Sequence, residues 1–194
     1  MEHENIALFD LDGTLCDYDK ALFDKLNELK SPKEPPLEPP FHDDAPDYVK
    51  ARANLIRASE DWWASIPKLQ LGWDVLELAE SLGYHTMILT AGPKRNPAAW
   101  SGKKKWIDKH LGEEQDVTIT RDKGLVYGKI LVDDYPPYIE RWLKWRKNGL
   151  VIMPAGPMNK KFKHPQVIRY DGENKREMYE ALKKRLEVKS KLSF

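Results

Sequence analysis

Two acidic side chains follow a short apolar run near the start of the chain, within the sequence IALFDLDGTL. The run Ile6–Phe9 is typical of a strand buried on both faces, and Gly13 marks a turn just beyond it. Asp10 and Asp12 therefore stand at the carboxyl end of a core strand, the edge where open α/β sheets bind ligands. Two carboxylates this close need a proton or a cation, and Mg²⁺ prefers such oxygen ligands. The alternative is a merely acidic turn, because Asp and Gly are common turn residues.

A second acidic pair, Asp133 and Asp134, follows another apolar strand pattern at residues 129–132. If both runs are parallel strands of one sheet, this pair completes the cation site that the first pair could only half build. The alternative is an N-cap for a helix over residues 138–147, which needs only one Asp. Either aspartate could be the direct ligand.

A hydroxyl group stands at the end of a third strand pattern. Thr90 closes the run 85–90 and precedes Ala91, Gly92 and Pro93. A hydroxyl and free backbone N–H groups at such a turn can contact a phosphate. Thr before Gly-Pro is also common turn chemistry, so this signal is weak by itself.

One of three successive lysines faces the apolar side of a helix predicted over residues 101–111. At 100° per residue, Lys103 projects along the centre of that side, Lys104 points to its edge, and Lys105 points away from it. A lysine aimed at the strand ends could hold a transferring phosphoryl group, whereas the other two are better interpreted as solvated charges.

Strand and helix patterns alternate along the chain, which predicts an α/β fold with a parallel sheet flanked by helices. Strands are expected at residues 6–9, 85–90, 117–120, 129–132, 150–153 and 167–170, and helices at 18–30, 47–65, 73–82, 101–111, 138–147 and 173–189. Residues 18–67 hold helices and a proline-rich loop, 31–46, but no clear strand pattern. We therefore predict a core of residues 1–17 and 68–194 with a small helical cap, residues 18–67, inserted after the first acidic motif.

Adjacent tryptophans, Trp62 and Trp63, lie near the end of this cap. Neighbouring positions on a helix point in different directions, so at most one ring need face the core. Two interpretations stay open: the rings pack the cap, or they form a stacking surface for a planar ligand such as a nucleobase.

The composition of the 194-residue chain is ordinary for a globular protein, with a net charge of +1. No global field favours nucleic acid or a membrane, and neither a secretory signal nor a membrane helix is expected. The single cysteine, Cys16, is interpreted as packing and fits a reducing, cytoplasmic location. A homodimer is left open.

The string DLDGTL after an apolar strand resembles the first motif of the haloacid dehalogenase-like (HAD) hydrolases. The resemblance implies a Rossmann-like core, a Mg²⁺ cofactor, and a cap that closes over the site and chooses the substrate. It implies that Asp10 attacks phosphorus to form an aspartyl-phosphate, and that Asp12 protonates the leaving oxygen and then activates water. Both carboxylates would also contact the metal.

The same resemblance implies roles for the other candidates. Thr90 stands where the second HAD motif is expected, and Lys103 where the third is expected. Asp134 is favoured as the direct metal ligand, with Asp133 supporting it by hydrogen bonds.

A closer resemblance covers most of residues 6–134. The stretches KKKWIDKHLG and ITRDKGLVYGKILVDD are similar to the 5'(3')-deoxyribonucleotidases, which remove phosphate from nucleoside monophosphates. This implies that Lys123 reaches the phosphate, and that Tyr18 and cap aromatics, here Trp62 and Trp63, line a base pocket. Ala91 departs from the serine that the family often has, so one hydroxyl contact to phosphate is missing.

We therefore predict a Mg²⁺-dependent phosphatase of small nucleoside monophosphates, with no membrane partner. One alternative is the same chemistry on phosphorylated nucleic-acid ends or on another small phosphomonoester. The balanced charge and the cap argue against nucleic acid, which needs a basic groove. A non-catalytic binding domain is the third possibility, but relict sites usually lose a carboxylate or the lysine.

Overall fold

The computed structural model describes residues 5–39, 41 and 44–187. They form two compact units. The first holds the described parts of residues 1–15, 69–91 and 116–194, and the second those of residues 16–68 and 92–115. No helix in the described ranges combines the length and apolar character that crossing a bilayer requires.

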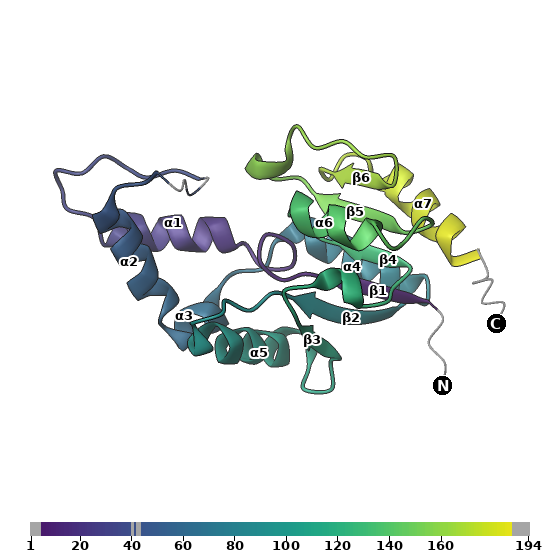
Figure 1. Ribbon diagram of the computed structural model, residues 1–194, viewed down its shortest axis with the longest axis horizontal. Coiled ribbons are helices and arrows are strands. Elements are labelled where there is room, and N and C mark those ends of the chain that lie inside the picture. Colours follow the sequence, from purple (N-terminus) through teal and green to yellow (C-terminus); the bar gives the residue numbers. More distant parts are fainter. Residues whose placement is uncertain (1–4, 40, 42–43, 188–194) are drawn as a thin grey trace. The chain divides into compact units, whose positions relative to one another are not determined.

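A six-stranded parallel sheet in the order β3-β2-β1-β4-β5-β6 forms the centre of the first unit (Figure 1). Its strands are β1 (Ile6–Phe9), β2 (His85–Thr90), β3 (Val117–Ile119), β4 (Ile130–Val132), β5 (Leu150–Pro154) and β6 (Val167–Tyr170). β1 lies between β2 and β4, where Leu8 pairs with Met87 and Leu131. The predicted parallel sheet is confirmed, and each strand lies within one residue of its predicted bounds.

Helices cover both faces of this sheet (Figure 1). The unit contains α4 (Gln70–Ser81), α6 (Pro136–Leu143), α7 (Lys175–Glu187) and two 3₁₀ helices, η1 (Lys123–Leu125) and η2 (Pro157–Asn159). On one face, α6 packs Ile139 and Trp142 against Leu8 and Leu131. Because successive side chains of a strand point to opposite faces, Phe9 points away from α6. Helices α4 and α7 cover that other face of the sheet. The predicted helix 173–189 is α7, and its last two positions lie outside the described residues.

Four helices make up the second unit: α1 (Tyr18–Glu28), α2 (Asp47–Arg57), α3 (Glu60–Ser65) and α5 (Pro97–Leu111). The single helix predicted over residues 47–65 is wrong, because Ser59 interrupts it. The Ser59 hydroxyl accepts the N–H of Trp62 at 3.2 Å and so caps a new helix, α3. The predicted loop, residues 31–46, has neither helix nor strand where it is described.

Residues 92–115 belong to the second unit, although the predicted boundaries placed them in the core with the rest of 68–194. The reason is the close packing of α5 on α3. At Gly102 an added Cβ would lie 2.4 Å from the Cβ of Trp63, so only glycine allows this approach. One turn later, Trp106 is buried and its Nε1 donates to the carbonyl of Ile66 at 2.7 Å.

Candidate active site

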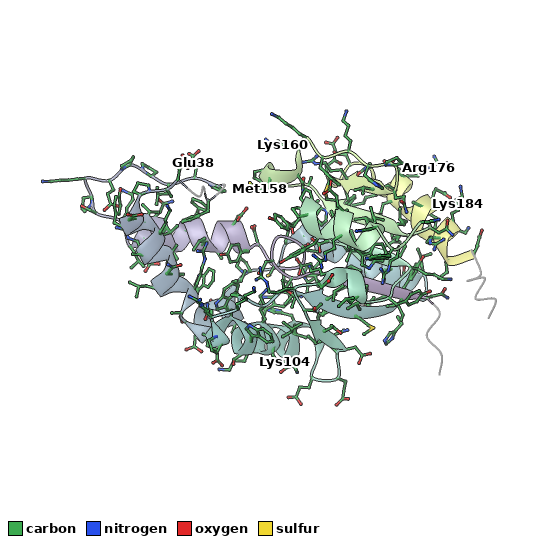
Figure 2. The ribbon with its side chains drawn as sticks, in the orientation of Figure 1. Glu38, Lys104, Met158, Lys160, Arg176 and Lys184 are labelled. Atoms are coloured by element: carbon green, nitrogen blue, oxygen red, sulfur yellow. The ribbon has the colours of Figure 1, made fainter. Side chains whose placement is uncertain are left out.

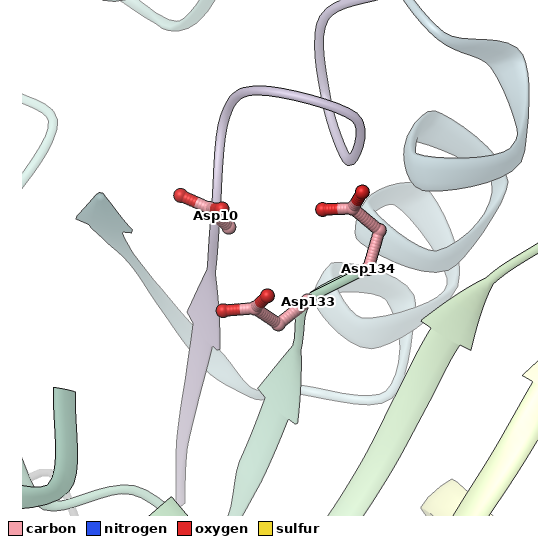
Figure 3. Close-up of side chains that lie close together, drawn as sticks. All are labelled: Asp10, Asp133 and Asp134. Atoms are coloured by element: carbon pink, nitrogen blue, oxygen red, sulfur yellow. The ribbon is translucent and has the colours of Figure 1, made fainter. Parts of the chain in front are cut away.

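Three carboxylates gather at the carboxyl ends of β1 and β4. These strands are neighbours, and the N–H of Asp10 continues their ladder by donating to the carbonyl of Val132 at 2.9 Å. One carboxylate oxygen from each of Asp10, Asp133 and Asp134 lies within 4.8 Å of the other two (Figure 3). In this strand order the connections reverse direction at β1 and β4, which is where open α/β sheets bind ligands.

Lys123, in η1, neutralises part of this charge. Its fully buried ammonium lies 2.6 Å from Asp133 Oδ2 and 2.9 Å from Asp10 Oδ1. Burial alone would lower the pKa of Lys123, but the two carboxylates outweigh it and raise the pKa above its usual value. The lysine therefore stays charged. The resemblance implied that Lys123 reaches a phosphate, but it gave no sign of this contact with two aspartates.

Burial works against the charged forms of the two aspartates after β4. It raises the pKa of Asp133 to about 6, with Lys123 pulling the value down and Asp10 pushing it up. Burial also raises the pKa of Asp134 well above its usual range, and the negative charges of Asp133 and Asp10 add to the effect. Keeping these carboxylates ionised and close together therefore lowers the stability of the folded protein, and a further positive charge would remove this effect.

The donor set fits a divalent cation. Asp10 Oδ1 is buried and has no hydrogen bond within the described residues, although the Lys123 ammonium lies close by. Among the ion pairs of the described residues, these three carboxylates share the ammonium of Lys123, so negative charge is in excess in this group. A small cation that prefers oxygen ligands, such as Mg²⁺, would compensate this excess charge.

The hydrogen bonds distinguish the two aspartates after β4. Both oxygens of Asp133 are engaged, one by Lys123 and the other by the N–H of Tyr135 at 2.9 Å. The Asp134 carboxylate accepts a long bond of 3.5 Å from the Thr14 hydroxyl. Asp134 thus has fewer hydrogen bonds to its carboxylate than Asp133, and its role as the direct ligand, with Asp133 supporting it, stays a prediction.

Two residues of the first motif lie against Asp134, and neither was predicted as a site residue. Gly13 has a φ of +72°, and a Cβ there would lie 2.4 Å from Asp134 Oδ2. Thr14 is fully buried. Both stand in the DLDGTL string, but only the fold brings them against a residue 120 positions later in the chain.

The remaining candidates of the first unit lie at strand ends, as predicted. Asp12 is partly buried, and its carboxylate is not part of the three-carboxylate group found among the described residues. Thr90 is fully buried at the end of β2, and its carbonyl accepts the N–H of Thr120 at 2.9 Å. Ala91 follows it and is partly buried. The roles of Asp12, Thr90 and Ala91 stay predictions.

Lys103 lies in the second unit, and its inward orientation is confirmed. Its exposed fraction is 3%, and its ammonium lies 5.5 Å from the ring centroid of Trp63. Lys104 projects away from α5 and pairs with Asp108 (Figure 2), and Lys105 is exposed and pairs with Glu60. A role for Lys103 toward phosphate stays a prediction.

The three aromatic residues predicted to line a base pocket form one cluster in the second unit. Tyr18 stacks on Trp63 with ring centroids 5.6 Å apart, and Trp62 meets Tyr18 edge-on at 5.8 Å. Trp63 is only 3% exposed, and its Nε1 donates to the carbonyl of Arg57 at 2.8 Å. Tyr18 and Trp62 are partly buried. The structure thus brings the three rings together, and their contact with a base stays a prediction.

The sequence of this chain matches a known protein family over most of its length. Residues 4–182 match the family model of the 5' nucleotidase, deoxy (pyrimidine), cytosolic type C proteins (NT5C). The chain belongs to this family. Its relatives include two proteins provisionally named 5'(3')-deoxyribonucleotidase. The one from Bordetella bronchiseptica is 28% identical and the one from Bordetella pertussis 27%, each over 143 residues that cover 68% of this chain and 74% of the relative.

Solved structures similar to this NT5C-family protein are HAD-like. A HAD hydrolase of family IA, variant 3, from Entamoeba histolytica has a TM-score of 0.52 at 17% identity, over 92% of this chain and 99% of that one. A protein of Thermotoga maritima, provisionally named β-phosphoglucomutase, has a TM-score of 0.52 at 11% identity, over 93% and 99%. At this identity the likeness concerns the fold. Together with the family match it confirms a HAD-type nucleotidase fold and a phosphomonoesterase class of enzyme.

Proposed function

We propose that this NT5C-family protein is a Mg²⁺-dependent phosphatase that removes phosphate from nucleoside monophosphates through an aspartyl-phosphate on Asp10. The cluster of Asp10, Asp133 and Asp134 around the buried Lys123 is the observation that carries the proposal. It joins a candidate nucleophile to a cation site at the edge of the sheet where ligands bind.

The proposed reaction has two steps. An oxygen of Asp10 attacks phosphorus, the bond from phosphorus to the ester oxygen breaks, and Asp12 donates a proton to the leaving nucleoside oxygen. Asp12 then takes a proton from water as that water attacks the phosphorus, which releases phosphate and restores Asp10. Lys123 orients the Asp10 carboxylate throughout, because its ammonium lies against Oδ1. Asp10, Asp134 and Asp12 would hold Mg²⁺, which would supply positive charge for the transferring phosphoryl group.

Substrate choice belongs to the second unit in this proposal. We propose that residues 18–67 act as the substrate-selecting cap, that Tyr18 and Trp62 contact the base, and that the buried Trp63 supports them. Lys103 and Lys123 would meet the phosphate together with Thr90 and Ala91. The names of the Bordetella relatives favour deoxyribonucleotides as substrates. A cytoplasmic location is part of the proposal.

The test is phosphate release from a panel of ribo- and deoxyribonucleoside 5'- and 3'-monophosphates, with MgCl₂ and with a chelator. Asp10→Asn should lower the rate by at least about 1,000-fold, because it removes the nucleophile while keeping the shape of the side chain. Asp24→Asn makes the same chemical change at an exposed position of α1 and should leave the rate unchanged.

Two results would overturn parts of the proposal. Full activity of folded Asp10→Asn would exclude the aspartyl-phosphate route. Faster turnover of a phosphorylated oligonucleotide than of any monophosphate would exclude the substrate class.

A further inference from the structure

A buried asparagine, Asn159, is hydrogen-bonded to the backbone of Asp134. Asn159 is 1% exposed, at the end of η2, whereas the adjacent Met158 and Lys160 are exposed (Figure 2). Its Nδ2 donates to the carbonyl of Asp134 at 3.0 Å and to the carbonyl of Pro154 at 2.8 Å. The side chain thus ties the loop after β4 to the end of β5.

The carbonyl oxygen of the Asn159 side chain also takes part in two hydrogen bonds. Asn159 Oδ1 accepts the N–H of Gly156 at 3.0 Å and the Nε–H of Arg169, on β6, at 3.1 Å. Two carbonyls face the NH₂ and two donors face the oxygen, so only one orientation of the amide satisfies all four groups. A buried network satisfied in this way is rigid, and each member lost leaves buried partners unbonded.

Asp134 is held from two sides as a result. Asn159 holds its backbone carbonyl, and Thr14 contacts its carboxylate at 3.5 Å. A Cβ on Gly13 would lie 2.4 Å from Asp134 Oδ2, so the glycine leaves the room that this carboxylate occupies. The position of the proposed metal ligand therefore depends on a residue 25 positions later in the chain.

We infer that Asn159 is a positioning residue that fixes Asp134 and so sets the affinity of the three-carboxylate cluster for a divalent cation. The inference rests on the proposed function, because it concerns the same cation. Partners that orient a metal ligand change metal affinity by about 10- to 100-fold when they are removed. Arg169 contributes by fixing the amide of Asn159 and has no contact of its own with Asp134 among the bonds recorded in the described chain.

Substrate-free protein titrated with MgCl₂ tests the inference, with cation binding followed by isothermal titration calorimetry and by the midpoint of thermal unfolding. Asn159→Ala should raise the half-saturating Mg²⁺ concentration by about 10- to 100-fold relative to the unchanged protein. If Asn159→Ala does not fold, Asn159→Ser is measured instead. Its hydroxyl can donate to only one of the two carbonyls, so a shift in the same direction is expected.

Asn27→Ala is the matched control. Asn27 holds a loop of the second unit, donating to the carbonyl of Leu37 at 2.8 Å and accepting the N–H of Leu37 at 2.8 Å. Its recorded bonds include neither Asp134 nor a partner of Asn159. The control should lower the unfolding temperature but leave the half-saturating Mg²⁺ concentration within about twofold. If Asn159 were only structural, its substitution would likewise lower the unfolding temperature without changing Mg²⁺ binding.

The outcomes separate the inference from the proposed function. If the unchanged protein binds Mg²⁺ and Asn159→Ala, or Asn159→Ser in its place, binds it equally well, the positioning role is wrong and the proposed function stands. If the unchanged protein neither binds Mg²⁺ nor needs it to release phosphate, the proposed function fails and the inference fails with it.

Discussion

The acidic cluster of the first unit and the aromatic cluster of the second are built on opposite principles. In the acidic cluster, Asp133 and Asp134 have raised pKa values, and Asp10 Oδ1 has no hydrogen bond in the described structure. In the aromatic cluster, Trp63 Nε1 donates to the carbonyl of Arg57, whose Nε donates in turn to the Tyr18 hydroxyl at 2.7 Å.

The acidic cluster is suited to bind a cation, whereas the packing of Trp63 is complete without a ligand. Like charges held in a buried site lower stability until a partner arrives, whereas packed rings with satisfied N–H groups need none. By this criterion Trp63 belongs to the architecture of its unit, and the partly buried Tyr18 and Trp62 are the better candidates for contact with a substrate.

Among the largest expected effects is that of removing the buried ammonium of Lys123 from the acidic cluster. Lys123→Met leaves Asp10 and Asp133 buried without their shared partner, so the free energy of unfolding should fall by about 3–5 kcal/mol. Urea unfolding at pH 7.5 measures it. Adding Asp133→Asn to Lys123→Met should recover part of the loss, because it removes one of the uncompensated charges.

Lys104→Met is the control for the lysine change. Lys104 is exposed and pairs with Asp108 one turn along α5, so its loss should alter stability by no more than about 0.5 kcal/mol. Equal stability of Lys123→Met and Lys104→Met would mean that the acidic cluster is not under electrostatic strain.

Substitution of Trp63 should mainly lower stability, and substitution of Trp62 should mainly weaken substrate binding. Trp63→Ala opens a cavity beside α5 and should cost about 3–5 kcal/mol of stability. Trp62→Ala should cost less stability but raise KM for nucleoside monophosphates, since a stacked base contributes about 1–3 kcal/mol. Chemical unfolding and steady-state kinetics are measured on both variants.

Ribose 5-phosphate, which has no base, is the control substrate for Trp62→Ala, and its KM should not change. A KM that rises equally for both substrates would place Trp62 outside the base contact. A Trp63→Ala protein as stable as the unchanged one would contradict the structural role of Trp63.

A smaller effect concerns pH. The pKa of Asp133 in the folded chain is about 6, above its ordinary value of 3.8, so folding favours the protonated form. Its contribution to the stability of the cation-free protein is therefore present below about pH 4 and is lost as the pH rises through about 6. Mg²⁺ competes with these protons, and the rise in unfolding temperature with MgCl₂ should be larger at pH 7.5 than at pH 5.

Measuring the difference with and without MgCl₂ at each pH cancels titration elsewhere in the protein. An equal rise at both pH values would show that protons and the cation do not compete for the acidic cluster. The same titration on Asp133→Asn should show a weaker pH dependence, since one of the competing groups is gone.

Much of the first unit could be predicted from local patterns. Buried parallel strands read as short apolar runs, which is why β2 and β6 begin and end at their predicted residues. The DLDGTL and ILVDD strings each carry their carboxylates directly after a strand, so strand pairing alone brings Asp10 and Asp133 together.

The second unit was harder because its boundaries depend on contacts distant in sequence. Residues 92–115 join it through Gly102, whose small size matters only beside Trp63. α5 begins at Pro97 and not at the predicted residue 101, because the Asn96 side chain caps the N–H of Ala99 at 3.4 Å. Asn159 was missed for the same reason, since its partner Asp134 belongs to another loop.

The central place of β1 has a consequence for synthesis on the ribosome. β1, which directly precedes Asp10, is made before both of its neighbours, β2 and β4, and the second of these ends only at Val132. Both edges of β1 stay unpaired until Thr90 is made, and one stays unpaired until Val132 is made, so this apolar segment is prone to association. A chaperone that holds β1 until its neighbours are made would reduce this association.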